Sequence, residues 1–327
     1  MEEAGAPYPW QSNVWAALTR RIDEGRLPHA VLLVGPQGLG KRELALRLAH
    51  VLLCLRRASN RPCGDCQGCH LVRAGNHPDY QCLTPAEGSR VIKVDAIREL
   101  SRTFSLKSQF GGHRVGVIVP AEQMNISAAN SLLKTLEEPP ADAMLILVAH
   151  RPARLPATIR SRCQTFQCHV PTRGAAGEWL RAHGHGEAAE LLGLVGNAPL
   201  AAIALKEEGG VAALGTLLEQ LSGIAKQRMT PVDAAAHWSK DQTEMVTNLL
   251  VSVTMDLIRV ETAGAKPRIS RLNQLPTGLD SSRLYDFLDE LMEQRRLADH
   301  PLNPQLVLES LFIRWGDLYT RGGGHGK

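Results

Sequence analysis

The hydrophobic pattern in the first half of the chain alternates short apolar runs with longer amphipathic ones. Apolar runs typical of buried strands occupy residues 30–34, 79–83, 114–119, 144–149 and 164–168. Between them lie stretches with helical spacing, among them 43–49 and 127–138, the second of which stops at Pro139. Strands that alternate with helices predict an α/β domain whose parallel sheet carries helices on both faces.

Helical spacing alone characterises the N-terminal segment and the second half of the chain. Before the first strand, apolar residues recur at intervals of three or four and then stop at Gly25; they are Trp10, Val14, Trp15, Leu18 and Ile22. We expect the two tryptophans to anchor this segment in the core. From residue 170 onward the same spacing predicts a succession of helices, the last of them capped by Asn303 with Pro304 in its first turn.

These patterns divide the chain into four parts. We expect an α/β domain over residues 1–168, a small helical domain over 169–208, a larger helical domain over 209–320 and a disordered tail over 321–327. Two consecutive glycines mark the boundary between the helical domains. A cysteine-rich stretch, residues 54–69, is expected to be an insertion between a helix and the second strand.

Composition and the lack of targeting or membrane-spanning patterns lead us to expect a cytoplasmic protein. The 327 residues are 44% hydrophobic but only 4% aromatic, which favours helices packed by aliphatic side chains. The net charge of +4 is too small to argue for nucleic-acid binding by itself. The N-terminus lacks a secretion signal, and the apolar run 249–258 is interrupted by polar residues and too short to span a bilayer. We therefore expect a cytoplasmic protein with no membrane partner.

A phosphate-binding loop is the clearest chemical motif. Residues 35–41 read Gly-Pro-Gln-Gly-Leu-Gly-Lys and lie between an apolar strand and a helical run, which is the context that a P-loop requires. Gly35, Gly38 and Gly40 would let backbone amides approach a phosphate, and Lys41 would add a positive charge. The motif predicts a P-loop nucleotide-binding fold.

The residues that hold magnesium in a working nucleotidase are missing. Arg42 stands where a Ser or Thr would bind the metal, and a guanidinium cannot ligate it. The strand 114–119 is followed by Pro120 instead of an acidic residue. Glu122 comes later and is interpreted as a solvated or helix-capping carboxylate, and His150 as a surface or loop residue. We expect no ATP hydrolysis by the chain alone, while weak nucleotide binding through the intact loop stays open.

Four of the seven cysteines have metal-binding spacing. They are Cys54, Cys63, Cys66 and Cys69, separated by eight, two and two residues. Two-residue spacers let thiolates converge on one ion, and a zinc ion held by four thiolates has a structural role. An iron-sulfur cluster is the alternative, although no Cys-Pro closes the run as it does in ferredoxins. The remaining three, Cys82, Cys163 and Cys168, are expected to be small buried hydrophobes.

The loop before the last strand is rich in arginine. Arg160 and Arg162 flank Ser161 in this loop. Taken alone, such side chains indicate a solvated basic surface without a special role.

Four motifs, in this order and with these separations, resemble the bacterial clamp-loader subunits of the AAA+ class. They are the P-loop at 35–41, the cysteine module, the run at 130–140 and the Ser-Arg-Cys triplet at 161–163. The resemblance covers at least residues 8–168 and continues more weakly beyond. Within the class, the altered P-loop and the missing acidic residue resemble the delta-prime type of DNA polymerase III subunit and not its ATP-hydrolysing gamma or tau paralogue.

The resemblance implies a role in replication. A subunit of this type supports ATP-driven loading of the sliding clamp onto primed DNA, as part of a hetero-pentamer with gamma/tau and delta subunits. It implies that Arg162 is an arginine finger acting on the ATP of a neighbouring subunit, and that all four clustered cysteines bind zinc. It also implies that residues 169–208 form a lid domain and that the C-terminal helices join an oligomeric collar. A planar guanidinium is suited to stabilise the charge that develops on a transferring phosphoryl group.

Departures from the family pattern leave two other functions to weigh. The intact glycines and Lys41 keep open an autonomous AAA+ ATPase with an atypical magnesium site, although Leu200 replaces the lid arginine that active members use to contact nucleotide. A zinc-dependent DNA-binding protein is the third hypothesis. The low net charge and the lack of a recognition-helix pattern near the cysteines count against it.

Overall fold

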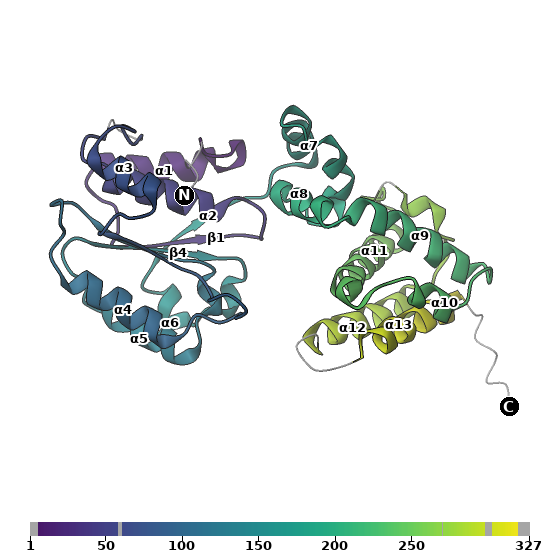
Figure 1. Cartoon of the computed structure of the whole chain (residues 1–327). Helices are drawn as coiled ribbons and strands as arrows, with labels where there is room; N and C mark the ends of the chain where they lie inside the picture. The colour runs from purple at the N-terminus through teal and green to yellow at the C-terminus, as the bar shows by residue number, and fades with distance from the viewer. Residues whose placement is uncertain (1–5, 58–60, 270, 298–302, 320–327) are drawn as a thin grey trace. The chain divides into compact units, whose positions relative to one another are not determined.

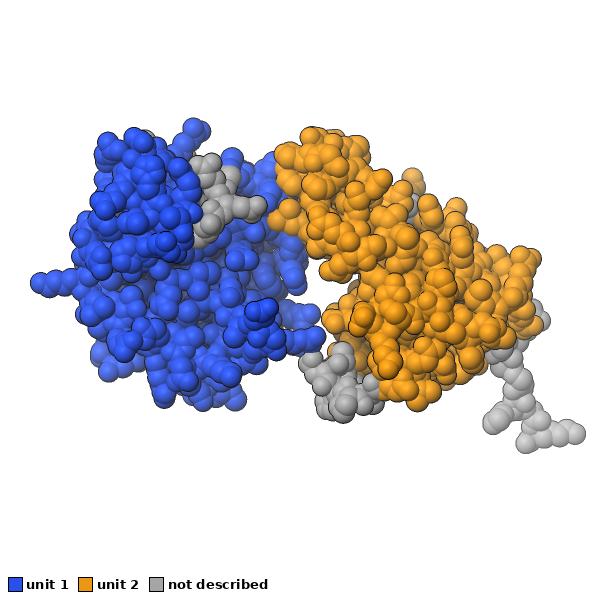
Figure 2. All heavy atoms as spheres, viewed as in Figure 1, with its two compact units in different colours: residues 1–171 blue, residues 172–327 orange. Residues whose placement is uncertain are grey.

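The computed structural model of the chain describes residues 6–57, 61–269, 271–297 and 303–319 (Figure 1). The chain forms two compact units, residues 1–171 and 172–327 (Figure 2). The predicted boundary after residue 168 falls within three residues of the division between the units. The predicted tail at 321–327 lies outside the described residues.

A five-stranded parallel sheet forms the centre of the first unit. Its strands lie in the order β2-β3-β4-β1-β5 and are all parallel to their neighbours. They are β1 (Ala30–Val34), β2 (Tyr80–Leu83), β3 (Arg114–Ile118), β4 (Ala143–Ala149) and β5 (Gln164–Gln167). Every residue of the three central strands is buried, whereas the edge strands β2 and β5 are partly exposed. Burial on both faces explains why the central strands are continuous apolar runs. The predicted parallel sheet is confirmed.

Helices cover both faces of this sheet (Figure 1). On one face lie α1 (Ser12–Asp23), α2 (Lys41–Leu53) and α3 (Gln67–Ala74), and on the other α4 (Val94–Ser105), α5 (Ile126–Glu137) and α6 (Ala157–Arg160). The apolar stripe of α1 is buried as predicted, including Trp15, whereas Trp10 precedes the helix and is half-buried. The Asn125 side chain caps α5 by accepting a hydrogen bond from the N–H of Ala128, which relieves an unpaired donor of the first turn.

The second unit is built from helices. They are α7 (Arg173–Ala182), α8 (Pro199–Glu207), α9 (Gly210–Ala225), α10 (Pro231–Ala236), α11 (Thr243–Ala263), α12 (Ser281–Leu297) and α13 (Pro304–Tyr319), with 3₁₀-helices at Gly186–Gly193, Lys240–Gln242 and Leu272–Gln274. The predicted cap of the last helix is confirmed, because Asn303 Oδ1 accepts a hydrogen bond from the N–H of Gln305.

One apolar core extends through the second unit. Buried side chains of α7, such as Leu180, belong to the same cluster as Leu217 of α9 and Trp315 of α13. The Trp315 indole N–H donates to the carbonyl of Leu221 at 2.9 Å, which satisfies its one donor inside the core. Because both predicted helical domains contribute to this core, the division between 208 and 209 stays a prediction.

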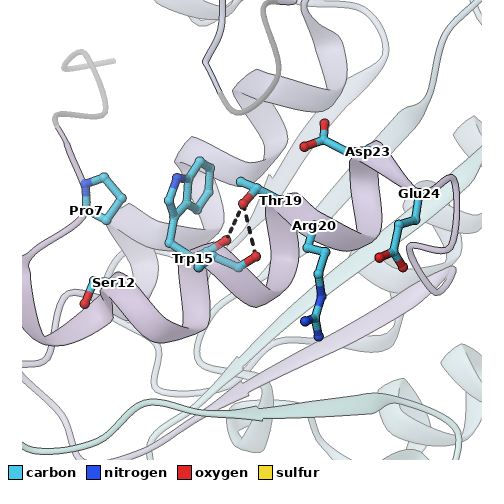
Figure 3. Close-up of a pocket in the computed structure, with 8 residues that line it drawn as sticks. Pro7, Ser12, Trp15, Thr19, Arg20, Asp23 and Glu24 are labelled. Atoms are coloured by element: carbon cyan, nitrogen blue, oxygen red, sulfur yellow. Dashed lines mark hydrogen bonds between the residues drawn. The ribbon is translucent and has the colours of Figure 1, made fainter.

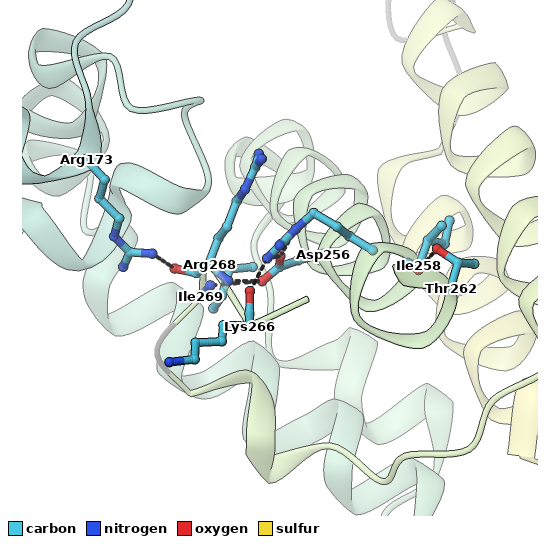
Figure 4. A network of polar contacts seen from close by, with 8 residues as sticks. Arg173, Asp256, Ile258, Thr262, Lys266, Arg268 and Ile269 are labelled. Atoms are coloured by element: carbon cyan, nitrogen blue, oxygen red, sulfur yellow. Dashed lines mark hydrogen bonds and ion pairs between the residues drawn. The ribbon is translucent and has the colours of Figure 1, made fainter. Parts of the chain in front are cut away.

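A buried carboxylate ties the loop after α11 to that helix. Asp256 accepts hydrogen bonds from the N–H groups of Arg268 at 2.7 Å and Ile269 at 2.9 Å, and forms an ion pair with Arg259 (Figure 4). Arg173 of α7 donates to the carbonyl of Arg268. The network therefore links α7, α11 and the loop through a carboxylate that is 5% exposed but fully paired.

Candidate functional sites in the N-terminal unit

The P-loop connects β1 to α2 and depends on its glycines. Gly35, Gly38 and Gly40 have φ values of +148°, +80° and +73°, which side chains with a Cβ rarely adopt. A Cβ on Gly35 would lie 2.6 Å from the carbonyl oxygen of Cys168, and one on Gly40 would lie 2.3 Å from the ring of Tyr8. The loop therefore has the backbone shape of a phosphate cradle at the start of a helix.

Lys41 is folded back onto the loop. Its side chain is 2% exposed, and Nζ donates to the carbonyl oxygens of Gly35 at 2.7 Å and Pro36 at 2.5 Å. Burial lowers the pKa of Lys41 to about 8, and the nearby Cys168 and Glu122 oppose this shift. A phosphate in the loop would have to replace these carbonyls as the partner of the amine.

Arg42 follows at the position of the missing metal ligand. Its side chain is exposed at the start of α2. Burial raises the pKa of the Cys82 thiol on β2, and the positive charge of Arg42 partly offsets that rise. A permanent cation therefore stands where a magnesium-binding hydroxyl is required.

Glu122 has a role that the sequence pattern did not reveal. Its Oε1 accepts hydrogen bonds from the backbone N–H groups of His150 and Arg151, each at 2.9 Å, and its side chain is half-buried. The interpretation of Glu122 as a solvated or helix-capping carboxylate was wrong, because it joins the segments that follow β3 and β4. Its position as the first carboxylate after β3 was the only signal in the sequence.

His150 lies beside the P-loop lysine. Its ring is half-buried, and both burial and the charge of Lys41 lower the pKa of His150, while Glu122 opposes this. His150 is a loop residue directly after β4, as one of the two expected placements had it, and it is half-buried. Burial and the neighbouring cation therefore both favour the uncharged form of this imidazole.

The N-terminal segment holds the P-loop from outside. Trp10 Nε1 donates to the carbonyl of Leu39 at 3.0 Å, and Gln11 Nε2 donates to the carbonyls of Leu39 and Gly40 at 2.7 Å each. The ring of Tyr8 stacks on that of Trp10 with 5.0 Å between centroids. Gln11, which is 1% exposed, was missed because one polar residue in a short segment carries no pattern.

A separate groove of about 470 Å³ runs along α1 (Figure 3). It is lined in part by Trp15, Arg20, Asp23 and Glu24, and Thr19 uses its hydroxyl to bond the carbonyl of Trp15 at 3.0 Å. None of the P-loop residues lines it.

The four clustered cysteines converge as predicted. Their sulfur atoms lie within 4.8 Å of one another, with Cys54 and Cys66 at 3.9 Å and Cys63 and Cys69 at 3.9 Å. A tetrahedral ion with sulfur ligands at about 2.3 Å places those sulfurs about 3.8 Å apart. The donor set therefore fits one tetrahedral ion and leaves no space for a cluster of several iron and sulfide atoms.

Local structure presents these thiols to one another. Cys54 follows the last residue of α2, and Cys66 caps α3 by accepting a hydrogen bond from the N–H of Cys69 at 3.4 Å. Although burial opposes ionisation of Cys66, backbone hydrogen bonds lower its pKa to about 6. Burial raises the pKa of Cys54 and of Cys69. Thiols must lose their protons to bind a cation, and a bound cation would favour that loss.

Arg162 lies apart from the P-loop of its own chain. It follows α6, and its guanidinium pairs with Glu137 at 2.6 Å and donates to the carbonyl of Thr158 at 3.0 Å. Neither partner belongs to the P-loop. The next residue, Cys163, is buried, and burial raises the pKa of its thiol to about 12, which suits a packing role.

Comparisons with known proteins assign the family. Residues 10–171 match the family model described as DNA polymerase III, delta subunit, and residues 211–317 match its C-terminal counterpart. DNA polymerase III subunit delta-prime of Pseudomonas aeruginosa is 36% identical over 323 residues, covering 95% of this chain and 98% of the relative. The same subunit of Escherichia coli is 30% identical over 328 residues, covering 94% of each. The chain belongs to the delta-prime family of DNA polymerase III subunits.

This member of the delta-prime family is also similar, over about half of its length, to a tau/gamma subunit. DNA polymerase III subunit tau/gamma of Haemophilus influenzae is 35% identical over 156 residues, covering 48% of this chain and 22% of the relative. A gamma subunit-related protein from Thermotoga maritima has a crystal structure with a TM-score of 0.50 and 18% identity, covering 93% of this chain and 99% of that one. The resemblance to the delta-prime type and the AAA+ fold are thus confirmed. Among the described helices, none is long and apolar enough to cross a membrane.

Proposed function

We propose that this delta-prime family member is a non-hydrolysing subunit of the DNA polymerase III clamp loader. In this role it supports ATP-driven loading of a sliding clamp onto primed DNA in the cytoplasm, in a hetero-pentamer with gamma/tau and delta subunits. The proposal rests on the family relationship and on the state of the chain's own P-loop site. Its collar function would belong to the helices of the second unit.

One observation carries the loss of hydrolysis. Arg42 places a cation at the first metal position, and the residues that follow β3, Val119 and Pro120, include no carboxylate. One oxygen of the nearest later carboxylate, Glu122, already accepts hydrogen bonds from two backbone N–H groups. Hydrolysis of ATP requires magnesium to be held against the phosphates, and these substitutions remove its ligands. The glycines and the lysine of the loop would by themselves support nucleotide binding at most, and not hydrolysis.

Arg162 is the residue proposed to act on a neighbour. It follows the short helix α6, and its side chain is 36% exposed, which leaves it open to contact by a partner. A guanidinium placed against a transferring phosphoryl group stabilises the developing charge and is worth about a thousandfold or more in rate. The chain can lose its own hydrolytic site and still be required for a neighbour's turnover.

Zinc is proposed as the ion of the four-cysteine site. Thiolate ligands in tetrahedral spacing select zinc, and a site closed by four sulfurs holds no position for a reacting water. Its role is to stabilise the segment between α2 and β2.

Reconstitution tests the arginine finger. The loader is assembled from this chain and its cognate subunits, and its DNA-stimulated ATPase is compared for wild type, Arg162→Ala and Arg160→Ala. Arg160 serves as the control because it ends α6, just before Arg162, and forms no ion pair among the described residues. We expect Arg162→Ala alone to lower turnover at the site facing this chain by about a thousandfold or more.

Three results would contradict parts of the proposal. Unchanged turnover with Arg162→Ala, or an equal loss with Arg160→Ala, would remove the finger role. Phosphate release by the isolated chain that disappears in Lys41→Ala would instead establish an autonomous ATPase. Thermal unfolding should be nearly unchanged in Arg162→Ala, because an exposed ion pair contributes less than about 1 kcal/mol.

A further inference from the structure

The guanidinium of Arg162 is held by its own chain. Its Nη2 lies 2.6 Å from Oε1 of Glu137, and its Nη1 donates to the carbonyl of Thr158 at 3.0 Å. The Glu137 side chain is 50% exposed, so the pair lies at the surface. Arg160, the last residue of α6, has no such partner among the described residues. The ion pair therefore distinguishes Arg162 from the arginine just before it.

Glu137 places a carboxylate at the C-terminus of α5. It is the last residue of that helix, and Glu138 follows as the cap. The carbonyl end of a helix carries a partial negative charge, so carboxylates there are unfavourable for the helix itself. Glu137 gains its compensating charge from Arg162, which comes from the segment after α6. The Glu137 carboxylate thus stabilises the contact between α5 and the segment after α6, although it is unfavourable for α5 itself.

The nitrogens of Arg162 that contact Glu137 and Thr158 are the ones with which an arginine finger contacts phosphate. A guanidinium grips phosphate oxygens with its N–H groups in a planar fork, and carboxylate oxygens fit the same fork. In this chain both terminal nitrogens of Arg162 already have acceptors, Glu137 and Thr158. To contact a phosphate on a neighbouring protomer with these nitrogens, the side chain must exchange Glu137 for the phosphate.

We propose that Glu137 is a positioning residue that keeps Arg162 withdrawn until the triphosphate of the neighbouring protomer takes its place. The inference rests on the proposed finger role of Arg162. An exposed ion pair shifts an equilibrium by up to about fivefold, so the carboxylate is a light restraint that a triphosphate can overcome. Because the restraint acts before the phosphate is contacted, it opposes nucleotide binding and leaves the chemical step unchanged.

The test separates KM from kcat in the reconstituted loader. Glu137→Gln keeps the shape of the side chain and removes its charge, and Glu138→Gln is the matched control because Glu138 is exposed and forms no ion pair in the described part of the chain. We expect Glu137→Gln to lower the apparent KM for ATP by about two- to fivefold with kcat unchanged. Glu138→Gln should change neither, and Glu137→Gln added to Arg162→Ala should have no effect on KM.

Each other outcome is decisive. A lower kcat in Glu137→Gln would mean that the carboxylate orients the finger for the reaction, and an unchanged KM would mean that it restrains nothing. An equal fall in KM in the Arg162→Ala background would assign the effect to the charge of Glu137 alone. If Arg162→Ala leaves turnover unchanged, the finger role fails first, and that result is obtained without any change at Glu137.

Discussion

Replacement of the P-loop lysine should make the stability of the first unit depend differently on pH. Lys41 is 2% exposed, and burial lowers its pKa from 10.5 to about 8. The charged amine is therefore destabilising inside the fold, and Lys41→Met removes that charge while keeping a long apolar side chain. We expect the wild type to gain stability relative to Lys41→Met as the pH rises above 8.

The sign and size follow from proton binding. Between pH 8 and 10.5 the unfolded chain binds a proton at Lys41 that the folded chain has released, so the free energy of unfolding rises with pH. The charged Lys41 amine lowers the free energy of unfolding by about 3 kcal/mol below pH 8, and this penalty is lost as the pH approaches 10.5. Between about pH 7.5 and 9.5 the wild type should gain about 2 kcal/mol on the variant.

Urea unfolding of the first unit, followed by pulse proteolysis at several pH values, measures this difference. Lys41→Met also loses the hydrogen bonds to Gly35 and Pro36, which offsets part of the stability that the variant gains by removing the charge. The change of unfolding free energy with pH is therefore a better test than the free-energy difference at one pH. Lys134→Met, at an exposed position on α5, is the control and should show no such slope. If the slopes of wild type and Lys41→Met coincide, Lys41 is charged at no cost and the reasoning fails.

Two further substitutions test the proposed zinc site and the P-loop backbone. Cys63→Ser should bring the zinc content well below one ion per chain, measured by mass spectrometry of the metal, because a serine hydroxyl does not ionise to replace a thiolate. Cys82→Ser should retain the metal, and full zinc content with unchanged thermal stability in Cys63→Ser would count against the ligand set. Gly40→Ala should destabilise the first unit by about 1–3 kcal/mol, since φ is +73° and its Cβ would meet the ring of Tyr8. Gly25→Ala, at φ +65° with nothing within 4 Å, should cost less; equal losses of unfolding free energy would show that the Tyr8 contact is irrelevant.

Local pattern was sufficient for much of the fold and for two sites. The strands were predicted within a residue of their bounds because burial on both faces leaves continuous apolar runs in a parallel sheet. The P-loop and the cysteine module were predictable because their chemistry comes from residues close together in sequence, at spacings set by a turn or a metal. The missing magnesium ligands were readable for the same reason, since Arg42 adjoins the loop.

Tertiary structure alone decided the contacts between distant segments. Glu122 bonds the backbone after β4, Gln11 bonds the P-loop, and Arg162 pairs with Glu137, in each case across more than twenty residues of sequence. Such pairs leave no periodic signal, because a polar side chain on a loop looks the same whether it faces water or a distant partner. The sheet order places the P-loop, Glu122 and His150 at the carboxyl ends of β1, β3 and β4, whereas Glu137 and Arg162 lie at the amino ends of β4 and β5. That order is set by the whole fold.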